Sequence, residues 1–427
     1  MSHDIVLEGR ALLKGELVDC CVAVKDGRIA EIKKVIGGSE SLDFSDNLLL
    51  PAAVDMHVHM REPGKEYKED FFTGTMAAAF GGVSCVIDMP NTIPMTTGAR
   101  ALKEKHLLLQ QKANVDYGLW GLLAPGSDVA ALSRGTVGLK FYMSETTGTA
   151  GTPVAEWSSL SRKSGEAIVA VHPEHPSEIL PGSPRDLEDY NRSRPPASEA
   201  RAIKDAGALF GNVHMCHVSS REGLLALLES RRSRKGGLIS AEVAPHHLLL
   251  NAKSPLGAMA KVNPPVRAVD DQAALWVALA NGQIDAVATD HAPHTVEEKR
   301  EDFWQAPSGI PGVETGFPLM LRAVKDGRLT LERCIEACCE WPAKRLGLKK
   351  GRIEVGYDAD IVAVHMRDVT KIKDGGMHSK CGWTPYSGME AIFPKMTMVR
   401  GSIVMRNGSM AAERGGRPVP IPSRRSQ

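Results

Sequence analysis

The chain has 427 residues, a length that is high for one simple domain and fits an α/β barrel carrying an additional module. Hydrophobic residues make up 43% of it and charged residues 24%, the balance of an ordinary globular protein. The 52 basic and 51 acidic side chains leave a net charge of +1, which argues against nucleic acid or an anionic membrane surface as a partner.

The expected compartment follows from two further features. No apolar run approaches the length needed to span a bilayer, and residues 1–4 lack the pattern of a signal peptide. The 8 cysteines show no paired zinc-knuckle spacing, and most lie within apolar or helical segments. Such thiols are typical of a reducing environment, so we expect a cytoplasmic protein.

Both ends of the chain predict short strands, and Asp26-Gly27 is a strong two-residue hairpin turn between two of them. Because an isolated hairpin is only marginally stable, we expect the two ends to join in one small β-sandwich domain, residues 1–50 plus 350–413. The tail, residues 414–427, contains several prolines and is expected to be loosely ordered. The strand patterns of the small domain lie at residues 4–9, 21–24, 28–32, 360–364 and 396–404.

Between the ends, buried-strand patterns alternate with helical ones, the signature of a parallel sheet. Eight strands with helices between them favour a closed (β/α)8 TIM barrel of the α/β class over an open sheet, here residues 51–349. The strand patterns lie at residues 54–59, 83–87, 117–123, 137–142, 167–172, 212–217, 239–243 and 284–289. The helical patterns include residues 70–80, 99–111, 197–209, 221–231 and 270–280.

The first barrel strand ends in His57 and His59. Side chains two apart on a strand point to the same face, so the two imidazoles converge and would clamp a divalent metal ion. Asp55 and Arg61 share this register. The simpler alternative is that these are two polar residues at a strand end that only hydrogen-bond to each other, because short motifs often occur without the function they suggest.

Other strands also end in polar residues. These are Lys140 on the fourth, His172 on the fifth, His217 on the sixth and Asp290 on the eighth. Any one histidine is more often a satisfied structural residue, but chemistry in such barrels gathers at the carboxyl ends of the strands. Together, the set predicts a metal centre.

Lys140 lies within the apolar run 137–142, where a charged ammonium group is costly. One interpretation is an ion pair with Asp290 or a neighbour. The alternative is that burial favours the neutral amine, which adds carbon dioxide, and that the resulting carbamate bridges two metal ions. A carbamate supplies two anionic oxygens, which an unmodified lysine does not.

These motifs resemble the amidohydrolase superfamily and, within it, the dihydroorotase family of the longer, allantoinase-like type. The likeness covers nearly the whole chain. The residues that carry it are Asp55 to Gly64, Asp88 to Thr92, Gly138 to Lys140, His217 to Ser220, Glu242 to His247, Asn263 to Arg267, Ala288 to His294 and Gly356 to Val362.

The resemblance implies a pair of divalent metal ions, preferentially Zn²⁺. One ion would be held by His57, His59 and Asp290, the other by His172 and His217, with carboxylated Lys140 as the bridge. Some members of the longer type have an aspartate at the position of Lys140, so the lysine here favours a full binuclear centre. The implied reaction interconverts N-carbamoyl-L-aspartate and L-dihydroorotate in pyrimidine biosynthesis. Asp290 would be its general acid and base.

Recognition of a substrate carboxylate requires cations and donors. Arg61 has a planar guanidinium suited to it, although a salt bridge with Glu62 or Asp70 is the alternative. The resemblance implies that Asn91 and His294 also bind this carboxylate. It further implies that Asn263 contacts the ring amide of the substrate. Gly148 and Gly151 predict a flexible loop that closes over the substrate.

Cys216 and Glu242 lie near strand ends, where they would bind an extra metal ion or, as we prefer, serve as a buried thiol and a supporting carboxylate. Allantoinase and hydantoinase or dihydropyrimidinase share the metal ligands and remain alternatives, as does a non-catalytic partner of a transcarbamoylase. The resemblance further implies a homodimer, with association to aspartate transcarbamoylase as an option.

Overall fold

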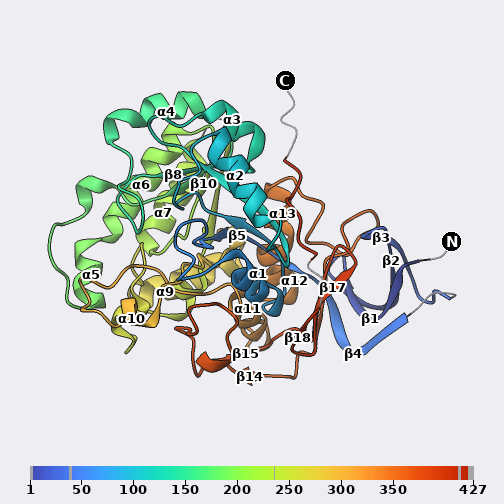
Figure 1. Ribbon diagram of the computed structural model, residues 1–427. Coiled ribbons are helices and arrows are strands. Elements are labelled where there is room, and N and C mark those ends of the chain that lie inside the picture. The colour runs from blue at the N-terminus through green and yellow to red at the C-terminus, as the bar shows by residue number, and fades with distance from the viewer. Residues whose placement is uncertain (1–2, 38–40, 235, 412–414, 422–427) are drawn as a thin grey trace.

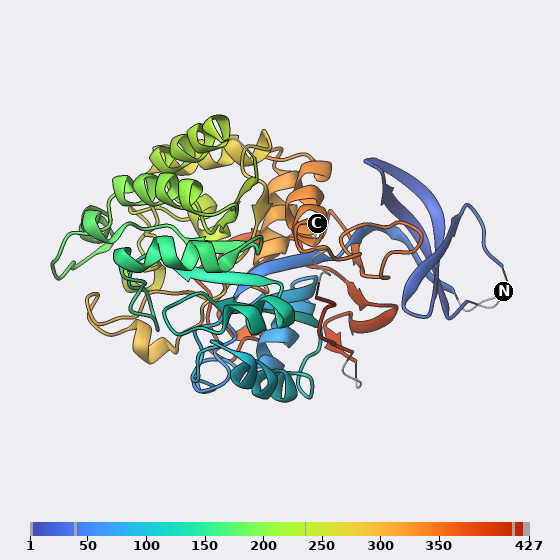
Figure 2. The same cartoon turned by 90° about the horizontal axis from the view of Figure 1, so that it is seen from above.

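The computed structural model describes residues 3–37, 41–234, 236–411 and 415–421. It consists of a barrel with helices around it and a smaller sheet that projects from one side (Figure 1). The view from above shows the first strands of the chain at the far end of this projection, well away from the centre of the barrel (Figure 2).

The barrel is one parallel sheet in which every strand pairs with its neighbours in sequence order, from β5 to β12. Nearly all of its strand residues are buried, so both faces are covered, as expected when helices surround the sheet. A parallel bridge between Val58 and His291 brings the first strand beside the chain after the last one. The strands are β5 (Ala53–Val58), β6 (Val83–Asp88), β7 (Asp116–Leu122), β8 (Gly138–Tyr142), β9 (Val169–His172), β10 (Asn212–Met215), β11 (Leu238–Val243) and β12 (Ala286–Val287).

Helices follow the strands, and local capping explains where several begin. The Asp70 carboxylate accepts from the Thr73 amide at the start of α1, and the Ser220 hydroxyl accepts from Gly223 at the start of α7. The α-helices are α1 (Phe71–Phe80), α2 (Ala99–Leu109), α3 (Val129–Gly135), α4 (Trp157–Ser164), α5 (Leu187–Ser193), α6 (Pro196–Leu209), α7 (Arg221–Ser233), α8 (Pro245–Leu249), α9 (Val269–Ala280), α10 (Val296–Lys299), α11 (Gly316–Lys325), α12 (Leu331–Ile335) and α13 (Trp341–Arg345). Shorter turns of helix are Val154–Glu156, Pro176–Glu178, Gly257–Ala260, Glu336–Glu340 and Asp374–Gly376.

The two ends of the chain form a single mixed sheet, in the order β18-β17-β16-β13-β4-β1-β2-β3. The join is the antiparallel pairing of β4 with β13, so the predicted union of the ends is found. The Asp26-Gly27 hairpin turn is also found, with φ of 52° and 75° at its two residues. The strands are β1 (Ile5–Leu13), β2 (Glu16–Lys25), β3 (Arg28–Lys33), β4 (Ser41–Pro51), β13 (Ile361–Val364), β16 (Met396–Val399), β17 (Ser402–Arg406) and β18 (Ser409–Met410), and a separate ribbon pairs β14 (Thr370–Lys371) with β15 (Glu390–Ala391).

Part of the tail expected to be loose packs against the barrel. The Tyr117 amide donates to the Arg417 carbonyl, and the Val419 amide donates to Tyr117. Val419 is buried among the apolar side chains of the barrel interior, such as Trp120 and Val137. Residues 415–421 therefore belong to the packed structure, whereas 412–414 and 422–427 lie outside the described residues.

No helix in the described part of the chain is both long and apolar enough to cross a membrane. All 8 cysteines are buried and free. The (β/α)8 barrel with a small β domain formed by the two chain ends is confirmed, and the small domain, expected to be a β-sandwich, is a single mixed sheet.

Candidate active site

Four histidines and Asp290 converge at the carboxyl ends of the barrel strands. The Nε2 atoms of His57 and His59 each lie 3.2 Å from Asp290 Oδ1. The His172 Nδ1 and His217 Nε2 atoms lie 3.1 Å apart. All five side chains are buried. The predicted ligands are therefore gathered in two adjoining groups, a set of three and a set of two.

In three of the four histidines an oxygen atom holds the ring nitrogen that faces away from this centre, whereas His217 Nδ1 has no hydrogen-bond partner among the described residues. Glu242 lies 2.5 Å from His57 Nδ1, the Asn91 amide oxygen lies 2.7 Å from His59 Nδ1, and Glu174 lies 2.9 Å from His172 Nε2. An acceptor on one ring nitrogen fixes the tautomer and leaves the lone pair of the other directed at a metal ion. The donor set thus fits divalent ions such as Zn²⁺.

The electrostatics of the first group favour a bound cation. Burial and nearby Lys140 oppose protonation of His57, but the carboxylates of Glu242 and Asp290 prevail and raise its pKa to about 10. Burial lowers the pKa of His59 to about 4 and that of His217 well below its usual value. Most of the imidazoles are therefore neutral near neutral pH, while the position between His57 and Asp290 attracts positive charge.

Two site residues have backbone conformations that non-glycine residues seldom adopt, with φ of 33° at His217 and 48° at Asp290. Arg61 is a third, with φ of 62°. Such conformations cost free energy and persist where the surrounding structure enforces them, often at functional sites.

Lys140 projects into the same centre and is fully buried. Its ammonium nitrogen lies 2.9 Å from Cys216 Sγ and 5.2 Å from the centroid of the Tyr142 ring. It forms no ion pair with any carboxylate of the described residues, so the ion pair with Asp290 that the sequence left open is not found. An unpaired ammonium group in such a place is unfavourable.

Cys216 and Glu242 adjoin the centre rather than forming part of it. Together with His57 they make a second candidate group, whose ligand atoms all lie within 4.8 Å of one another. Glu242 also lies 2.9 Å from His214 Nε2, so the carboxylate bridges two imidazoles. The supporting role of Glu242 and the extra metal ion therefore both remain predictions.

Arg61 lies beside the metal-ligand cluster, at one wall of the cavity. Its Nε donates to the Pro293 carbonyl over 3.0 Å, and its Nη2 lies 3.0 Å from His294 Nε2. Neither predicted alternative is found: Glu62 pairs with Lys112, and Asp70 pairs with Lys380. Arg61 is only 4% exposed. Its charge is therefore buried without a carboxylate partner among the described residues.

His294 is buried behind Arg61 and does not reach the cavity wall. The Lys68 ammonium lies 2.9 Å from its Nδ1, and the Ser308 carbonyl lies 3.1 Å from its Nε2. Burial, with Arg61 and Lys68 nearby, lowers the pKa of His294 well below its usual value. A neutral ring that accepts from Lys68 carries its proton on Nε2 and donates to Ser308, which leaves Arg61 Nη2 free for another acceptor.

The two predicted amide contacts line the cavity and hold the glycine-containing loop. Asn91 Nδ2 donates to the Thr147 carbonyl, and Asn263 Nδ2 donates to the Thr146 hydroxyl, both over 3.1 Å. The Thr147 hydroxyl donates to the Ser308 carbonyl over 2.8 Å. The cavity beneath this loop has a volume of about 30 Å³, room for about one water molecule. The loop therefore stands closed over the site.

A second loop, residues 303–309, contributes Ser308 and Gly309 to the cavity wall and is held by two buried ammonium groups. Lys261 donates to the carbonyls of Phe303, Trp304 and Ala306 over 2.7–3.1 Å. Lys299 donates to the carbonyls of residues 261, 307 and 309 over 2.9–3.2 Å. These contacts fix the backbone beside Ser308, whose hydroxyl lies 3.0 Å from that of Tyr190.

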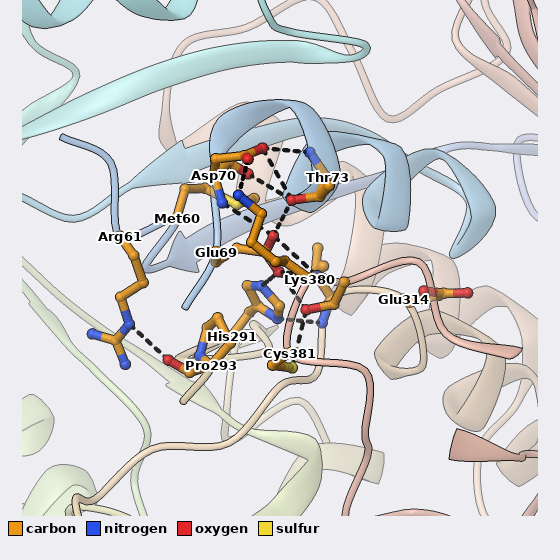
Figure 3. Close-up of polar contacts among 12 residues, drawn as sticks. Met60, Arg61, Glu69, Asp70, Thr73, His291, Pro293, Glu314, Lys380 and Cys381 are labelled. Atoms are coloured by element: carbon orange, nitrogen blue, oxygen red, sulfur yellow. Dashed lines mark hydrogen bonds and ion pairs between the residues drawn. The ribbon is translucent and has the colours of Figure 1, made fainter. Parts of the chain in front are cut away.

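The buried carboxylate of Glu69 lies between His291 and the segment around Lys380, and so ties the barrel mouth to the C-terminal part of the chain (Figure 3). Glu69 accepts from the Ser379 hydroxyl and from the Lys380 amide, and lies 3.5 Å from His291 Nε2. The His291 carbonyl in turn accepts from the His59 amide over 2.7 Å. Residues distant in sequence thus support the chain that carries Asp290.

The structure gathers every metal-ligand residue expected from the sequence, and it places Arg61, Asn91 and Asn263 at the cavity wall. It adds supporting residues that strand-end patterns did not identify, namely Glu174, Lys261, Lys299 and Ser308. Glu174 had one available signal, since it follows His172 by two residues. The two lysines had none, because nothing in their local sequence indicates burial.

Comparison with known proteins agrees with this geometry. The sequence model of the amidohydrolase family matches residues 48–404. A dihydroorotase of Methanosarcina acetivorans is 38% identical over 422 residues, 92% of this chain and 90% of the relative, and one of Thermoplasma volcanium is 38% identical over 403 residues, 93% and 94%. Among solved structures, an L-hydantoinase (dihydropyrimidinase) of Arthrobacter aurescens superposes with a TM-score of 0.91 at 30% identity, over 97% of this chain and 99% of that one.

Proposed function

The chain belongs to the amidohydrolase family and is a cyclic-amide hydrolase, and from this premise we propose that it is a dihydroorotase. The reaction is the reversible cyclisation of N-carbamoyl-L-aspartate to L-dihydroorotate in de novo pyrimidine biosynthesis. The dihydroorotases among its sequence relatives support this choice. The hydantoinases and dihydropyrimidinases among its structural neighbours are the alternative.

One observation carries the choice between them: the buried guanidinium of Arg61 has no carboxylate partner in the described part of the chain. In Figure 3 it points to Pro293, apart from the acidic side chains of Glu69 and Asp70. A buried cation is unfavourable unless a ligand neutralises it. Dihydroorotate brings a carboxylate, whereas dihydrouracil and unsubstituted hydantoin do not.

We assign two divalent ions, preferentially Zn²⁺, to the centre. His57, His59 and Asp290 would hold one ion, and His172 with His217 would hold the other. Carboxylated Lys140 would bridge them. When bound, such ions polarise a ring carbonyl and make water a stronger acid.

Asp290 is the proposed general acid and base. Burial opposes its ionisation, but the facing imidazoles of His57 and His59 hold the pKa of its carboxyl well below the usual range. The ionised carboxylate takes a proton from the attacking water and delivers it to the leaving ring nitrogen. In the cyclising direction it takes the proton of the carbamoyl nitrogen.

Arg61 would bind the substrate carboxylate, with Asn91 beside it and Asn263 at the ring amide. His294 would act through Arg61, since it lies behind the guanidinium. The closed loop must open for a substrate to enter, because the present cavity is far smaller than a six-membered ring with its substituents. Reclosure would restore the contacts of Thr146 and Thr147 and exclude water.

The test is a substrate panel. The purified protein is assayed with dihydroorotate, allantoin, hydantoin and dihydrouracil, with its metal content measured in parallel. The proposal expects dihydroorotate to be preferred, at about two metal ions per chain when Lys140 is fully carboxylated. Preference for dihydrouracil or hydantoin would replace it with a hydantoinase function.

We further propose that the protein is cytoplasmic and forms a homodimer. We also propose that this dimer associates with aspartate transcarbamoylase. These proposals rest on the resemblance alone. Light scattering of the purified protein tests the dimer, and co-sedimentation with the transcarbamoylase tests the association.

A further inference from the structure

One positive charge near Arg61 has no assigned use. Lys65 is partly buried, and its ammonium group forms no hydrogen bond or ion pair with the described residues. It belongs to the loop that carries Arg61, and its backbone amide donates to the Arg61 carbonyl over 3.1 Å. The two cations therefore leave the same short turn.

The Lys65 ammonium approaches Gly148 of the closing loop on the side where Asn91 lies; Lys65 itself does not line the closed cavity. A Cβ atom added to Gly148 would lie 3.2 Å from Lys65 Nζ and 3.6 Å from Asn91 Nδ2. Asn91 lines the cavity, and so does Thr147, the residue before this glycine. A side chain at position 148 would displace the tip of Lys65 by a few tenths of an ångström, and the φ of 85° at Gly148 itself favours glycine.

The charges of this corner do not balance. Burial lowers the pKa of Lys65, and the nearby charges of Arg61 and Lys68 lower it further; burial and Arg61 likewise lower the pKa of Lys68. Glu298 is the acidic residue that faces them, and Lys68 already lies 2.7 Å from it. Arg61 also feels the charges of Asp290 and Asp88, but neither Arg61 nor Lys65 forms an ion pair with a carboxylate of the described residues.

We infer that Lys65 is a second substrate-binding cation, which shares the carboxylate of the substrate with Arg61 once the loop has closed. This inference rests on the proposed function. A carboxylate has about four lone-pair positions, so it accepts from a guanidinium and an ammonium group at the same time. The ammonium group is a compact charge on a flexible stem, suited to following the loop as it moves.

The experiment compares steady-state kinetics of the wild type with Lys65→Met and Lys65→Arg. Lys65→Met is expected to raise the KM for dihydroorotate about tenfold, the order of effect of one partly screened charge-assisted hydrogen bond, with kcat within about twofold. Lys65→Arg should restore most of the affinity. Lys163→Met, an exposed lysine on α4, is the control and should leave KM unchanged.

A neutral cyclic imide separates binding of the carboxylate from a general structural effect. If dihydrouracil is turned over at all, its KM should be the same in Lys65→Met and in the wild type. An unchanged KM for dihydroorotate in Lys65→Met, or equal losses for both substrates, would overturn the inference while dihydroorotase activity stands. A wild type that rejects dihydroorotate would overturn the proposed function itself.

Discussion

Lys140 Nζ lies 2.9 Å from Cys216 Sγ, and no carboxylate of the described residues pairs with it. A buried lysine elsewhere in the barrel behaves differently: Lys105 lies 2.6 Å from the Asp88 carboxylate. Lys261 and Lys299 are held by backbone carbonyls, whereas Lys140 has only the Cys216 thiol within hydrogen-bond distance in the described part of the chain. A carbamate at this position would remove its positive charge and supply two oxygens to the metal ions.

Replacing Lys140 with Ala should therefore lower metal content and turnover together, and short carboxylic acids should restore part of both. Metal analysis and assays with added acetate or propionate measure this. Lys105→Ala is the matched control, expected to lower stability without any response to the acids. Growth on ¹³C-bicarbonate gives a direct readout, because an active, fully metallated enzyme without a carbamate signal would exclude the bridge.

Asp290→Asn should lower kcat in both directions about a hundred- to ten-thousandfold, the usual contribution of general acid–base catalysis. The amide keeps the shape of the side chain but takes up no proton. Metal content must be measured, because Asp290 is also a proposed ligand. Asp270→Asn on the exposed face of α9 is the control. Near-native turnover by a fully metallated Asp290→Asn protein would show that another group transfers the proton.

Arg61→Met should discriminate between charged and neutral substrates. Truncating one partner of a desolvated charge pair costs about 2–5 kcal/mol, or about thirtyfold to several thousandfold in kcat/KM for dihydroorotate. A neutral cyclic imide should lose little. The measurement is kcat/KM of the wild type and of Arg61→Met for dihydroorotate and for the neutral imide. Normal hydrolysis of dihydroorotate by Arg61→Met would favour a hydantoinase-like function.

Strand-end residues were predictable because a parallel barrel imposes a simple rule. Each strand runs in the same direction, so His57, Lys140, His217 and Asp290 had to meet at one end once eight strands were recognised. The alternation of buried and helical segments identified those strands. Glycine spacing likewise indicated the loop over the site.

Contacts between loops were not predictable by the same reasoning. Ser379 approaches Glu69, and Lys261 approaches Phe303, only because the complete fold brings these segments together. Strand β12 is shorter than predicted. The sequence predicts a strand over residues 284–289, whereas only Ala286–Val287 form one. Beyond them the Asp55 carboxylate accepts from the Thr289 amide, so a side chain takes the place of ladder bonds.

Lys299→Met should weaken substrate binding by loosening the loop of residues 303–309. The substitution removes the hydrogen-bond donor of three carbonyl groups, and each buried carbonyl left without a donor costs about 1–3 kcal/mol. We expect a lower free energy of unfolding and a raised KM, with unchanged metal content because the loop holds no ligand. Lys204→Met, which removes an exposed pair with Glu229, is the control. An unchanged KM in a folded Lys299→Met protein would show that the loop keeps its shape without the ammonium group.

His246 should make the protein sensitive to acid. Its ring is fully buried, neither ring nitrogen has a partner among the described residues, and burial lowers its pKa to about 4 from a usual value of 6.5. Between these values the unfolded chain binds a proton that the folded chain excludes, so the free energy of unfolding rises with pH across this range. The stability that the neutral His246 ring contributes is fully present above pH 6.5. As the pH falls from 7 to 5, the free energy of unfolding decreases by about 2 kcal/mol through this group.

His246→Leu should remove this contribution, because leucine does not titrate. Urea unfolding at pH 7 and pH 5 measures it: the difference between the two free energies should shrink by about 2 kcal/mol relative to the wild type. Titrating groups that do not interact with His246 cancel in the comparison. His247 does not cancel: His246 helps to lower its pKa, so in His246→Leu that pKa moves back toward its usual value and the difference shrinks further. His365→Leu, at a partly exposed position, should leave the difference as it is in the wild type. If His246→Leu retains the full pH dependence, the buried ring of His246 is not the source, and the acid sensitivity must come from the remaining buried histidines, His247 foremost, since burial and His246 hold its pKa well below the usual value.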